Sequence, residues 1–326
     1  MNLWLSAQKA DFVNPPHLSI VTSLYKSGET VGPFIERAAA AAAKVTPDYE
    51  IILVNDGSPD ATRATAIEAI KNYPRVTLID LSRNFGQLAA IHAGLTFARG
   101  KYIFMLDSDL EEPPELIESF YARLAANPDI DVVYGIQNER KDPFLRAMTS
   151  RLFYWCFERM TGIANLKNML VLRIVTRRFL DAYLSIGDYH LFVAGLTHQA
   201  GFDKETITVE KEYKGYSSYS FKKRLTMAGN AILSFSTQPL YGIFVGSLVA
   251  ALLLVLMAVG LVLTRVMHPE YQAGWSSLVI SIWLVGAIIT NCMAVIGLYI
   301  AKIFEQVKER PRFIVRQIYS SEQTTS

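Results

Sequence analysis

Over residues 18–135, short apolar runs rich in β-branched side chains alternate with longer segments of helical composition. This alternation predicts βαβ units, and hence an α/β domain whose mainly parallel sheet is covered by helices on both faces. The expected strands are Leu18–Leu24, Tyr49–Val54, Val76–Ile79, Tyr102–Leu106 and Asp131–Tyr134, and the expected helices are Glu29–Lys44, Pro59–Asn72, Gln87–Ala98 and Pro113–Ala126.

Two long uncharged stretches follow this pattern further along the chain. No charged residue occurs from Leu225 to Thr264 or from Tyr271 to Ala301, and each stretch exceeds the ~20 residues that span a bilayer core. We therefore expect two membrane helices, over residues 239–263 and 275–300. The alternative is a pair of buried core helices in a soluble protein.

Basic residues gather on the outer flanks of these two helices, whereas their connector, residues 264–270, carries a single Arg. Lys and Arg of short loops collect on the cytoplasmic side, so both flanks are expected there. The first residues also lack the basic and apolar regions of a signal peptide. We therefore expect an integral protein of the cytoplasmic (inner) membrane with both termini in the cytoplasm. The flanking residues are Lys222, Lys223, Arg224, Lys302, Lys308, Arg310, Arg312 and Arg316.

These patterns divide the chain into five expected regions. Segment 143–160 mixes aromatic residues with Arg, which is typical of a helix in the lipid headgroup region, although a helix packed on the sheet would carry a similar stripe. The regions are an N-terminal extension (1–17), a cytoplasmic α/β domain (18–215), a juxtamembrane amphipathic segment (216–238), a transmembrane hairpin (239–301) and a cytoplasmic tail (302–326).

Composition excludes several classes of protein. The chain is 51% hydrophobic and 19% charged with a formal net charge of +2, so neither a disordered protein nor a basic nucleic-acid binder is expected. Two distant cysteines and five histidines without paired spacing argue against a disulfide framework and a zinc site. The glycine-rich dinucleotide motif, the phosphate-loop motif and the nucleophile elbow are absent, which disfavours dehydrogenases, phosphate-loop hydrolases and serine hydrolases.

Polar clusters follow three successive predicted strands, at Asn55–Ser58, Ser82–Gln87 and Asp107–Leu110. Ligands of parallel sheets bind at the carboxyl ends of the strands, so these clusters are the first candidates for chemistry. Ser58 or Asp60 alone could simply cap the helix that follows. The paired carboxylates of Asp107 and Asp109, however, suit one hard cation and its bridging diphosphate, and we expect Mg²⁺ or Mn²⁺.

In order and content these segments resemble family 2 glycosyltransferases of the GT-A fold. The similarity is to the branch of dolichol-phosphate mannose synthase, bactoprenol glucosyltransferases and undecaprenyl-phosphate aminoarabinose transferases. It covers nearly the whole chain, including the pair of terminal helices. The motifs that carry it are Val54–Ser58, Ser82–Gly86, Asp107–Leu116, Gly215–Phe221 and Arg310–Val315.

The resemblance implies roles for individual residues of this chain. Asp109, with Asp107, would bind the metal, and Asp56 would hydrogen-bond the nucleotide base. Glu29 stands in a loop that departs from the family's usual sequence after the first strand. The residues expected in the nucleotide-sugar site are Ser23, Tyr25, Glu29, Asp56, Gln87, Asp107 and Ser108.

Two departures from the family pattern concern the acceptor site. Val171 stands where many relatives have an acid, and Glu212 and Ser218 stand where they tend to have Arg and Lys. We expect Arg173 to take part in catalysis, because a guanidinium can hold a phosphate through two hydrogen bonds. The candidates for binding the acceptor phosphate are Arg173, Lys211, Lys214 and Lys222.

The activity implied by the resemblance is inverting transfer of a sugar from a nucleotide-diphosphate sugar to a polyprenyl (undecaprenyl) phosphate, in synthesis or modification of cell-envelope glycans. A phosphate monoester with a second pKa near ~6 is mostly dianionic at neutral pH, so it needs little help from a general base and tolerates Val171. The alternatives are a processive polysaccharide synthase and a non-catalytic membrane subunit that senses nucleotide. The two helices and the apolar Phe313–Val315 could also support a homo-oligomer.

Overall fold

The computed structural model describes residues 15–137, 159, 169–186, 201–209, 238–267, 274–308 and 310–321. Contacts divide the chain into two compact units, one of residues 1–150, 163–218 and 311–326 and one of residues 151–162 and 219–310. Lys211, Lys214 and Lys222 lie outside the described residues. So do residues 143–160 except Arg159, and residues 216–238 except Gln238.

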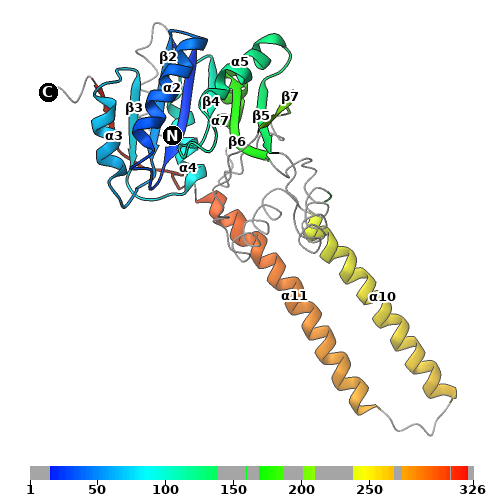
Figure 1. Ribbon diagram of the computed structural model, residues 1–326. Coiled ribbons are helices and arrows are strands. Elements are labelled where there is room, and N and C mark those ends of the chain that lie inside the picture. Colours follow the sequence, from blue (N-terminus) through cyan, green and yellow to red (C-terminus); the bar gives the residue numbers. More distant parts are fainter. Residues whose placement is uncertain are drawn as a thin grey trace. The chain divides into compact units, whose positions relative to one another are not determined.

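An eight-stranded mixed sheet forms the centre of the first unit, in the order β7-β5-β6-β4-β1-β2-β3-β8 (Figure 1). Strands β4, β1, β2 and β3 pair in parallel, whereas β6 lies antiparallel between β4 and β5, and β8 pairs antiparallel with β3. Strand β7 is parallel to β5. The strands are β1 (Leu18–Leu24), β2 (Tyr49–Asn55), β3 (Val76–Leu81), β4 (Tyr102–Met105), β5 (Val132–Gln137), β6 (Met169–Thr176), β7 (Lys204–Val209) and β8 (Val315–Ser320).

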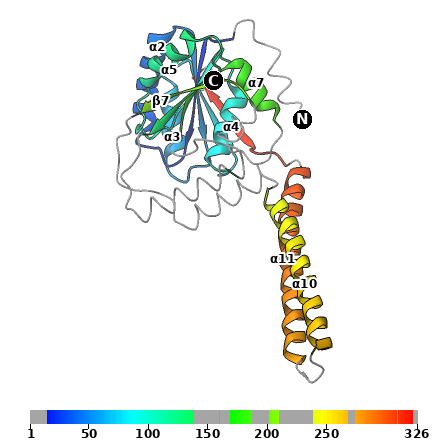
Figure 2. The same cartoon turned by 90° about the vertical axis from the view of Figure 1, so that its right-hand side faces the viewer.

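Helices cover both faces of this sheet, as Figure 2 shows with the sheet seen nearly edge-on. Helices α2, α3 and α5 lie on one face, and α4 and α7 lie on the other. The central strands are buried on both faces, which explains why they read as nearly continuous apolar runs. The helices are α2 (Val31–Val45), α3 (Thr62–Ile70), α4 (Gln87–Phe97), α5 (Leu116–Ala126) and α7 (Arg177–Ser185).

The strand order places a switch in topology between β1 and β4. From β1 the chain moves outward through β2 to β3, and it then crosses back over α4 to place β4 on the other side of β1. Loops that leave the carboxyl ends of two such strands diverge, which opens a crevice for a ligand. The fold therefore directs attention to the loops after β1 and β4.

The α/β fold with a mainly parallel sheet is confirmed, and each of the five predicted strands is present. Strand β3 continues to Leu81, two residues beyond the predicted end, and β5 runs from Val132 to Gln137. No strand is predicted from the sequence after residue 134. Strands β6, β7 and β8 are therefore additions, and two of them, β6 and β8, run against the direction of their neighbours.

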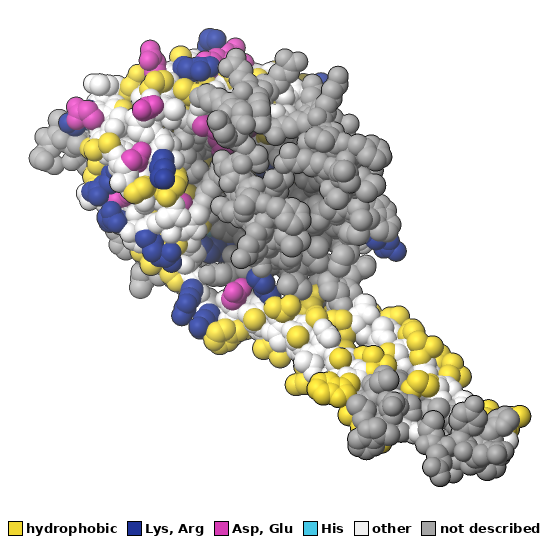
Figure 3. All heavy atoms as spheres, turned by 60° about the horizontal axis from the view of Figure 1, so that its bottom comes forward, with side chains coloured by type: hydrophobic (Ala, Val, Ile, Leu, Met, Phe, Trp, Pro, Cys, Tyr) yellow, Lys and Arg dark blue, Asp and Glu magenta, His cyan; other side chains and the backbone are white. Residues whose placement is uncertain are grey.

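The second unit contains two long apolar helices, α10 (Gln238–Met267) and α11 (Trp275–Val307). Both are long and apolar enough to cross a membrane, with candidate spans at Leu240–Met257 and Ser281–Val307. Large apolar side chains on both helices are exposed, including Leu252 (59%) and Trp283 (77%), and hydrophobic side chains cover much of their surface in Figure 3. This exposure is the opposite of what buried core helices would show, so the soluble-core alternative is not supported.

Candidate active site

The loops after β1 and β4 are joined at the switch point by a serine. The Ser108 hydroxyl donates to the backbone oxygen of Ser23 (3.0 Å) and lies 3.2 Å from the Ser27 hydroxyl. Ser108 is buried, whereas its neighbours Asp107 and Asp109 are half-buried and exposed. The loop is therefore anchored through its middle residue, which leaves an aspartate on each side at the carboxyl edge of the sheet.

The two aspartates each make a local hydrogen bond. Asp107 Oδ1 accepts from the side-chain amide of Gln87 (2.8 Å), and Asp109 Oδ1 accepts from the backbone N–H of Glu111 (2.9 Å). Leu110, which directly follows Asp109, has a φ of 61°, a left-handed conformation that is costly for a bulky residue. Such strain is retained where the surroundings fix a loop in one shape, and it is found here beside the paired acids.

The donor set of this loop fits a hard divalent cation. Mg²⁺ is commonly held by one or two carboxylates, with water and substrate phosphates completing its coordination. Among the described residues there is no group of three or more His, Cys, Asp or Glu side chains that could hold a metal by themselves. Asp107 and Asp109 would therefore hold Mg²⁺ or Mn²⁺ together with oxygens of a bound diphosphate.

Asp56, just after β2, is buried and organises the neighbouring loop. Its two carboxylate oxygens accept the backbone N–H groups of Phe85 (2.7 Å) and Gly86 (2.9 Å), and its backbone oxygen accepts from the Asn84 side chain (3.2 Å). Burial raises the pKa of Asp56, while these N–H groups and the charge of Arg83 act in the opposite direction. The residue implied to recognise the base thus also links the loops after β2 and β3.

Gly57 is required where these two loops touch. Its φ is 59°, and a Cβ atom built at this position would lie 2.4 Å from the backbone carbon of Arg83. Any side chain would push the two loops apart and would also force its own backbone into a strained region. The glycine of the Asn-Asp-Gly-Ser motif is therefore a requirement of packing between the loops.

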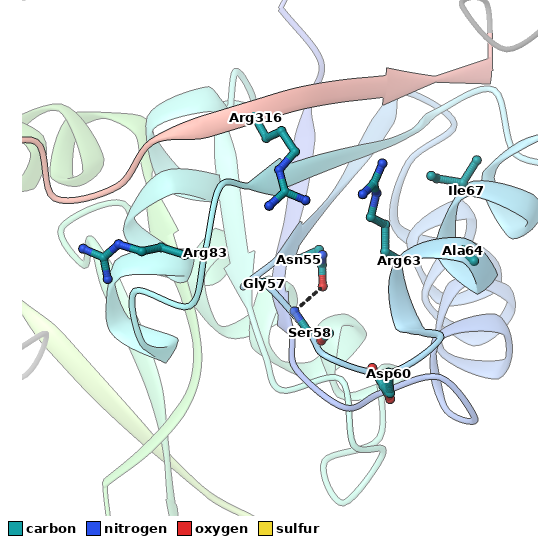
Figure 4. Close-up of a pocket in the computed structure, with 9 residues that line it drawn as sticks. All are labelled: Asn55, Gly57, Ser58, Asp60, Arg63, Ala64, Ile67, Arg83 and Arg316. Atoms are coloured by element: carbon teal, nitrogen blue, oxygen red, sulfur yellow. Dashed lines mark hydrogen bonds between the residues drawn. The ribbon is translucent and has the colours of Figure 1, made fainter.

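A polar cavity of about 440 Å³ lies beside the loop after β2, and α3 and β8 also contribute residues to its lining. Figure 4 shows Arg63 and Arg316 directed toward one space beside Asn55. Both guanidinium groups lie 3.4 Å from the buried carboxylate of Asp80, which also accepts from the Asn55 amide (2.7 Å). The cavity is lined by Asn55, Gly57, Ser58, Asp60, Arg63, Ala64, Ile67, Arg83 and Arg316.

Arg173, predicted as a phosphate anchor, lies on β6 and is only 5% exposed. Its guanidinium donates to the backbone oxygens of Val171 (3.0 Å) and Leu170 (2.9 Å). Burial lowers the pKa of Arg173 to about 10, against the influence of Tyr183, Tyr134, Glu112 and Asp107, so it stays charged at neutral pH. Its charge interacts with Asp107 and Glu112, and its hydrogen bonds to the backbone occupy part of its donor capacity.

The remaining predicted residues lie on the loop after β1 and around it. Tyr25 and Glu29 are exposed there, and Lys26 between them has φ of 56°. Ser58 Oγ accepts from the backbone N–H of Lys26 (3.0 Å), which ties this loop to the one after β2. Asp60 Oδ1 accepts from the Thr62 N–H (3.2 Å) at the start of α3. The N-cap of α3 is Ala61, so neither residue is the cap itself: Asp60 bonds the first residue of the helix, whereas Ser58 bonds the loop after β1.

Several residues around the site were missed by the sequence analysis. Asp80, 0% exposed, was hidden in an apolar strand, although a charge in such a run is itself a signal. Arg312 was predicted as a basic flank and as part of the Arg310–Val315 motif, but not as a partner of the sheet unit, where its Nη1 donates to Nε2 of His92 on α4 (3.0 Å). The Phe313 ring packs edge-on against the same histidine. These tail residues thus belong to the unit that carries the aspartates.

Comparison with known proteins identifies the family. The model of glycosyl transferase family 2 matches residues 19–180. A protein of Mycobacterium tuberculosis described as a glycosyltransferase is 37% identical over 310 residues, which cover 94% of this chain and 90% of its own. The undecaprenyl-phosphate 4-deoxy-4-formamido-L-arabinose transferase of Yersinia enterocolitica is 33% identical, over 94% of this chain and 95% of its own. The chain belongs to glycosyl transferase family 2.

Structural similarity was also found at low sequence identity. Glucosyl-3-phosphoglycerate synthase of M. tuberculosis matches with a TM-score of 0.49 and 16% identity, over 71% of this chain and 82% of its own. The family assignment rests on the sequence relatives, which extend over the sheet unit and the apolar helices alike. The protein is therefore an enzyme of the glycosyltransferase class.

Proposed function

We propose that this protein transfers a sugar from a nucleotide-diphosphate sugar to a polyprenyl phosphate at the cytoplasmic face of the inner membrane. The observation that carries the proposal is the pair of aspartates at the switch point of the sheet, in a chain that also bears two exposed apolar helices. Relatives that span nearly the whole chain are named as undecaprenyl-phosphate transferases, which supports a lipid phosphate as acceptor.

The donor would lie across the carboxyl edge of β1 and β4, with its base toward Asp56 and its diphosphate toward Asp107 and Asp109. Ser23, Tyr25, Glu29, Gln87 and Ser108 complete the proposed donor site. Asp107 and Asp109 would hold Mg²⁺ or Mn²⁺, which would supply a Lewis acid for the departing diphosphate. The aspartates thus place a positive charge where negative charge develops, and this is usually a large contribution to catalysis.

The acceptor accounts for the apolar helices. A polyprenyl chain leaves the bilayer at a cost of about 0.8 kcal/mol per buried CH₂, so the enzyme must reach its substrate at the membrane. We propose that residues 239–301 form a transmembrane hairpin, that residues 216–238 lie at the interface, and that the domain of residues 18–215 and the tail of residues 302–326 are cytoplasmic. The hairpin also suits a homo-oligomer.

At the reacting end of the acceptor, a dianionic phosphate would attack the anomeric carbon from the face opposite the leaving group, which inverts its configuration. Because the phosphate is already mostly ionised at neutral pH, no carboxylate base is needed where Val171 stands. Arg173 is proposed to supply positive charge to the acceptor site, and Lys211, Lys214 and Lys222 are proposed to contact the phosphate with it. Bringing two anions together is the task that these basic residues perform.

The test is reconstitution of the purified protein with undecaprenyl phosphate, Mg²⁺ or Mn²⁺ and a panel of nucleotide sugars. We expect one donor to give a lipid-linked sugar of inverted configuration, and product to disappear when the metal is chelated. Asp109→Asn should lose most of this activity, and Asp129→Asn, an exposed aspartate away from the proposed site, serves as its matched control. A polymer that forms without lipid would indicate a processive synthase instead, and nucleotide binding without turnover would indicate a sensing subunit.

A further inference from the structure

The tail that follows the apolar helices reaches the donor side of the sheet. Strand β8 pairs with β3, and the residues just before it contact α4 and the end of β3. The match to the family model ends at residue 180, so it does not include this segment. The contacts of the tail with the donor loops therefore lie outside the part of the chain that the family model matches.

Two tail residues hold the backbone of Ser82 from both sides. The Ser82 N–H donates to the backbone oxygen of Ile314 (2.9 Å), and the Ser82 oxygen accepts from Nη2 of Arg316 (2.6 Å). Ser82 opens the loop that continues to Phe85 and Gly86, whose N–H groups bind Asp56. The tail thus fixes the first residue of a loop whose last residues hold the proposed base-binding aspartate.

The same arginine reaches the neighbouring strand through Asp80. Arg316 Nη1 lies 3.4 Å from the buried carboxylate of Asp80, which in turn accepts from Asn55 at the end of β2. Asn55 Oδ1 then accepts from the backbone N–H of Ser58 (3.3 Å). One side chain from β8 is therefore connected to both loops, the one after β2 and the one after β3.

An irregularity in β8 explains how Arg316 reaches both groups. Val315 is paired with Leu81 and Gln317 with Asp80, and the register shifts between these two pairs. Arg316 is therefore the extra residue of a β-bulge, a device that redirects a side chain at the edge of a sheet. A regular antiparallel strand would alternate its side chains between the two faces without this redirection.

We propose that Arg316 is a positioning residue for the nucleotide of the donor, acting through Ser82 and Asp80 on the loops around Asp56. The inference rests on the proposed function, because it takes the site around Asp56 as the nucleotide site. A purely structural role, in which Arg316 only neutralises the buried Asp80 beside Arg63, is the competing explanation. The two explanations predict different nucleotide binding when the charge of Asp80 is removed together with that of Arg316.

The experiment compares the full-length wild type with Arg316→Gln and with the double variant Asp80→Asn, Arg316→Gln. Binding of UDP, GDP and CDP, each with Mn²⁺, is measured by titration calorimetry, and the KM values of donor and lipid phosphate are measured with kcat. The control is Arg123→Gln on α5, an exposed arginine that pairs with Glu205 outside the proposed nucleotide site. Thermal unfolding reports the stability of each variant.

We expect Arg316→Gln to raise the Kd of the nucleotide and the KM of the donor about tenfold, as loss of one charge-assisted hydrogen bond would. The acceptor KM and kcat should stay within about twofold, and Arg123→Gln should match the wild type. The double variant lacks the Ser82 contact too, so it should show the same shift. It also keeps the test available if the single variant does not fold with Asp80 left beside Arg63 alone.

The proposal is overturned if a folded Arg316→Gln binds the nucleotide as the wild type does, or if the double variant regains wild-type binding. Failure of the proposed function is distinguishable from this result. A wild type that binds one nucleotide but transfers no sugar contradicts the transferase proposal, while the binding measurements still decide on Arg316. A wild type that binds none of the three and has no activity contradicts both.

Discussion

The loops after β2 and β3 differ from the loop after β4 in how they use their polar groups. In the first pair, Asp56 binds backbone N–H groups of the neighbouring loop, and Asp80 is buried among Asn55 and two arginines. In the loop after β4, the polar residues Ser108 and Glu112 are buried, whereas Asp109 is exposed. The polar side chains around the loops after β2 and β3 stabilise the shape of these loops, whereas the loop after β4 exposes a carboxylate to solvent.

This difference predicts which property a mutation will change. Removing a buried acceptor or adding an atom between braced loops leaves unpaired groups or overlap, so stability is lost first. An exposed carboxylate contributes little to stability, because water solvates it in the folded and the unfolded chain alike. Variants of the braced loops should therefore unfold more easily, whereas variants of the acidic loop should fold normally and fail in catalysis.

The largest effect is expected for Asp109→Asn. Loss of a ligand to the proposed metal should lower kcat about 10²- to 10³-fold, as loss of one group that stabilises developing charge does. Unfolding free energy should change by less than about 0.5 kcal/mol, because the side chain is exposed and an amide oxygen can still accept the Glu111 N–H. Initial rates with saturating donor and lipid phosphate, together with thermal unfolding, check both parts. A large loss of stability would contradict the contrast between the loops.

Gly57→Ala tests the braced loops with a built-in control. We expect it to lower the free energy of unfolding by about 3 kcal/mol, because a left-handed alanine is strained and its Cβ overlaps the Arg83 backbone. Gly201→Ala has a similar φ of +70°, but a Cβ there meets no atom of the described residues within 4 Å, so only about 1 kcal/mol should be lost. Urea unfolding of both variants in detergent measures the difference. Equal effects would mean that contact between the loops is not what requires the glycine.

A smaller effect concerns His92, which braces α4 against the tail. Arg312 can only donate, so Nε2 of His92 must accept, and burial with the nearby Arg312 charge lowers the pKa of His92 to about 4. In the unfolded chain the histidine takes up a proton near its ordinary value of about 6.5. The contribution of the buried, neutral His92 to the unfolding free energy is thus complete above about pH 6.5 and is lost as the pH falls toward 4. We expect the unfolding free energy to drop by about 2 kcal/mol from pH 7 to pH 5.

Urea unfolding at the two pH values measures this change against His92→Gln. The variant has no imidazole to titrate. The fall in its unfolding free energy from pH 7 to pH 5 should therefore be about 2 kcal/mol smaller than that of the wild type. A variant with an undiminished pH dependence would show that other groups are responsible.

The sequence allowed the parallel half of the sheet and the polar loops at its edge to be predicted. Local pattern suffices there, because a βαβ unit brings successive strand ends to one edge whatever lies elsewhere. The same reasoning placed Asn55–Ser58, Ser82–Gln87 and Asp107–Leu110 together. It gave no account of β6 or β8, because antiparallel pairing joins residues such as Thr77 and Ser320 that are far apart in sequence.

The candidate residues were predictable to different degrees for a similar reason. Asp107 and Asp109 lie where the motif and the strand end place them. The burial of Arg173 and its bonds to its own strand depend on packing from β4, β5 and α7, which no local pattern encodes. The network of Asp80 with Arg63 and Arg316 likewise needed three distant segments. The assignment of roles to these residues in the site stays a prediction until the variants are measured.

Strand β8 has one more consequence, for the biosynthesis of the protein. The ribosome makes β3 early and β8 only after both apolar helices, so the outer edge of β3 lacks its partner while those helices are being made. An open edge of this kind pairs readily with foreign strands, and Ser82 meanwhile has no Ile314 or Arg316 to bind. Synthesis of both apolar helices therefore comes before completion of the sheet, and a nascent chain halted after α11 would carry both aspartates in an unfinished enzyme.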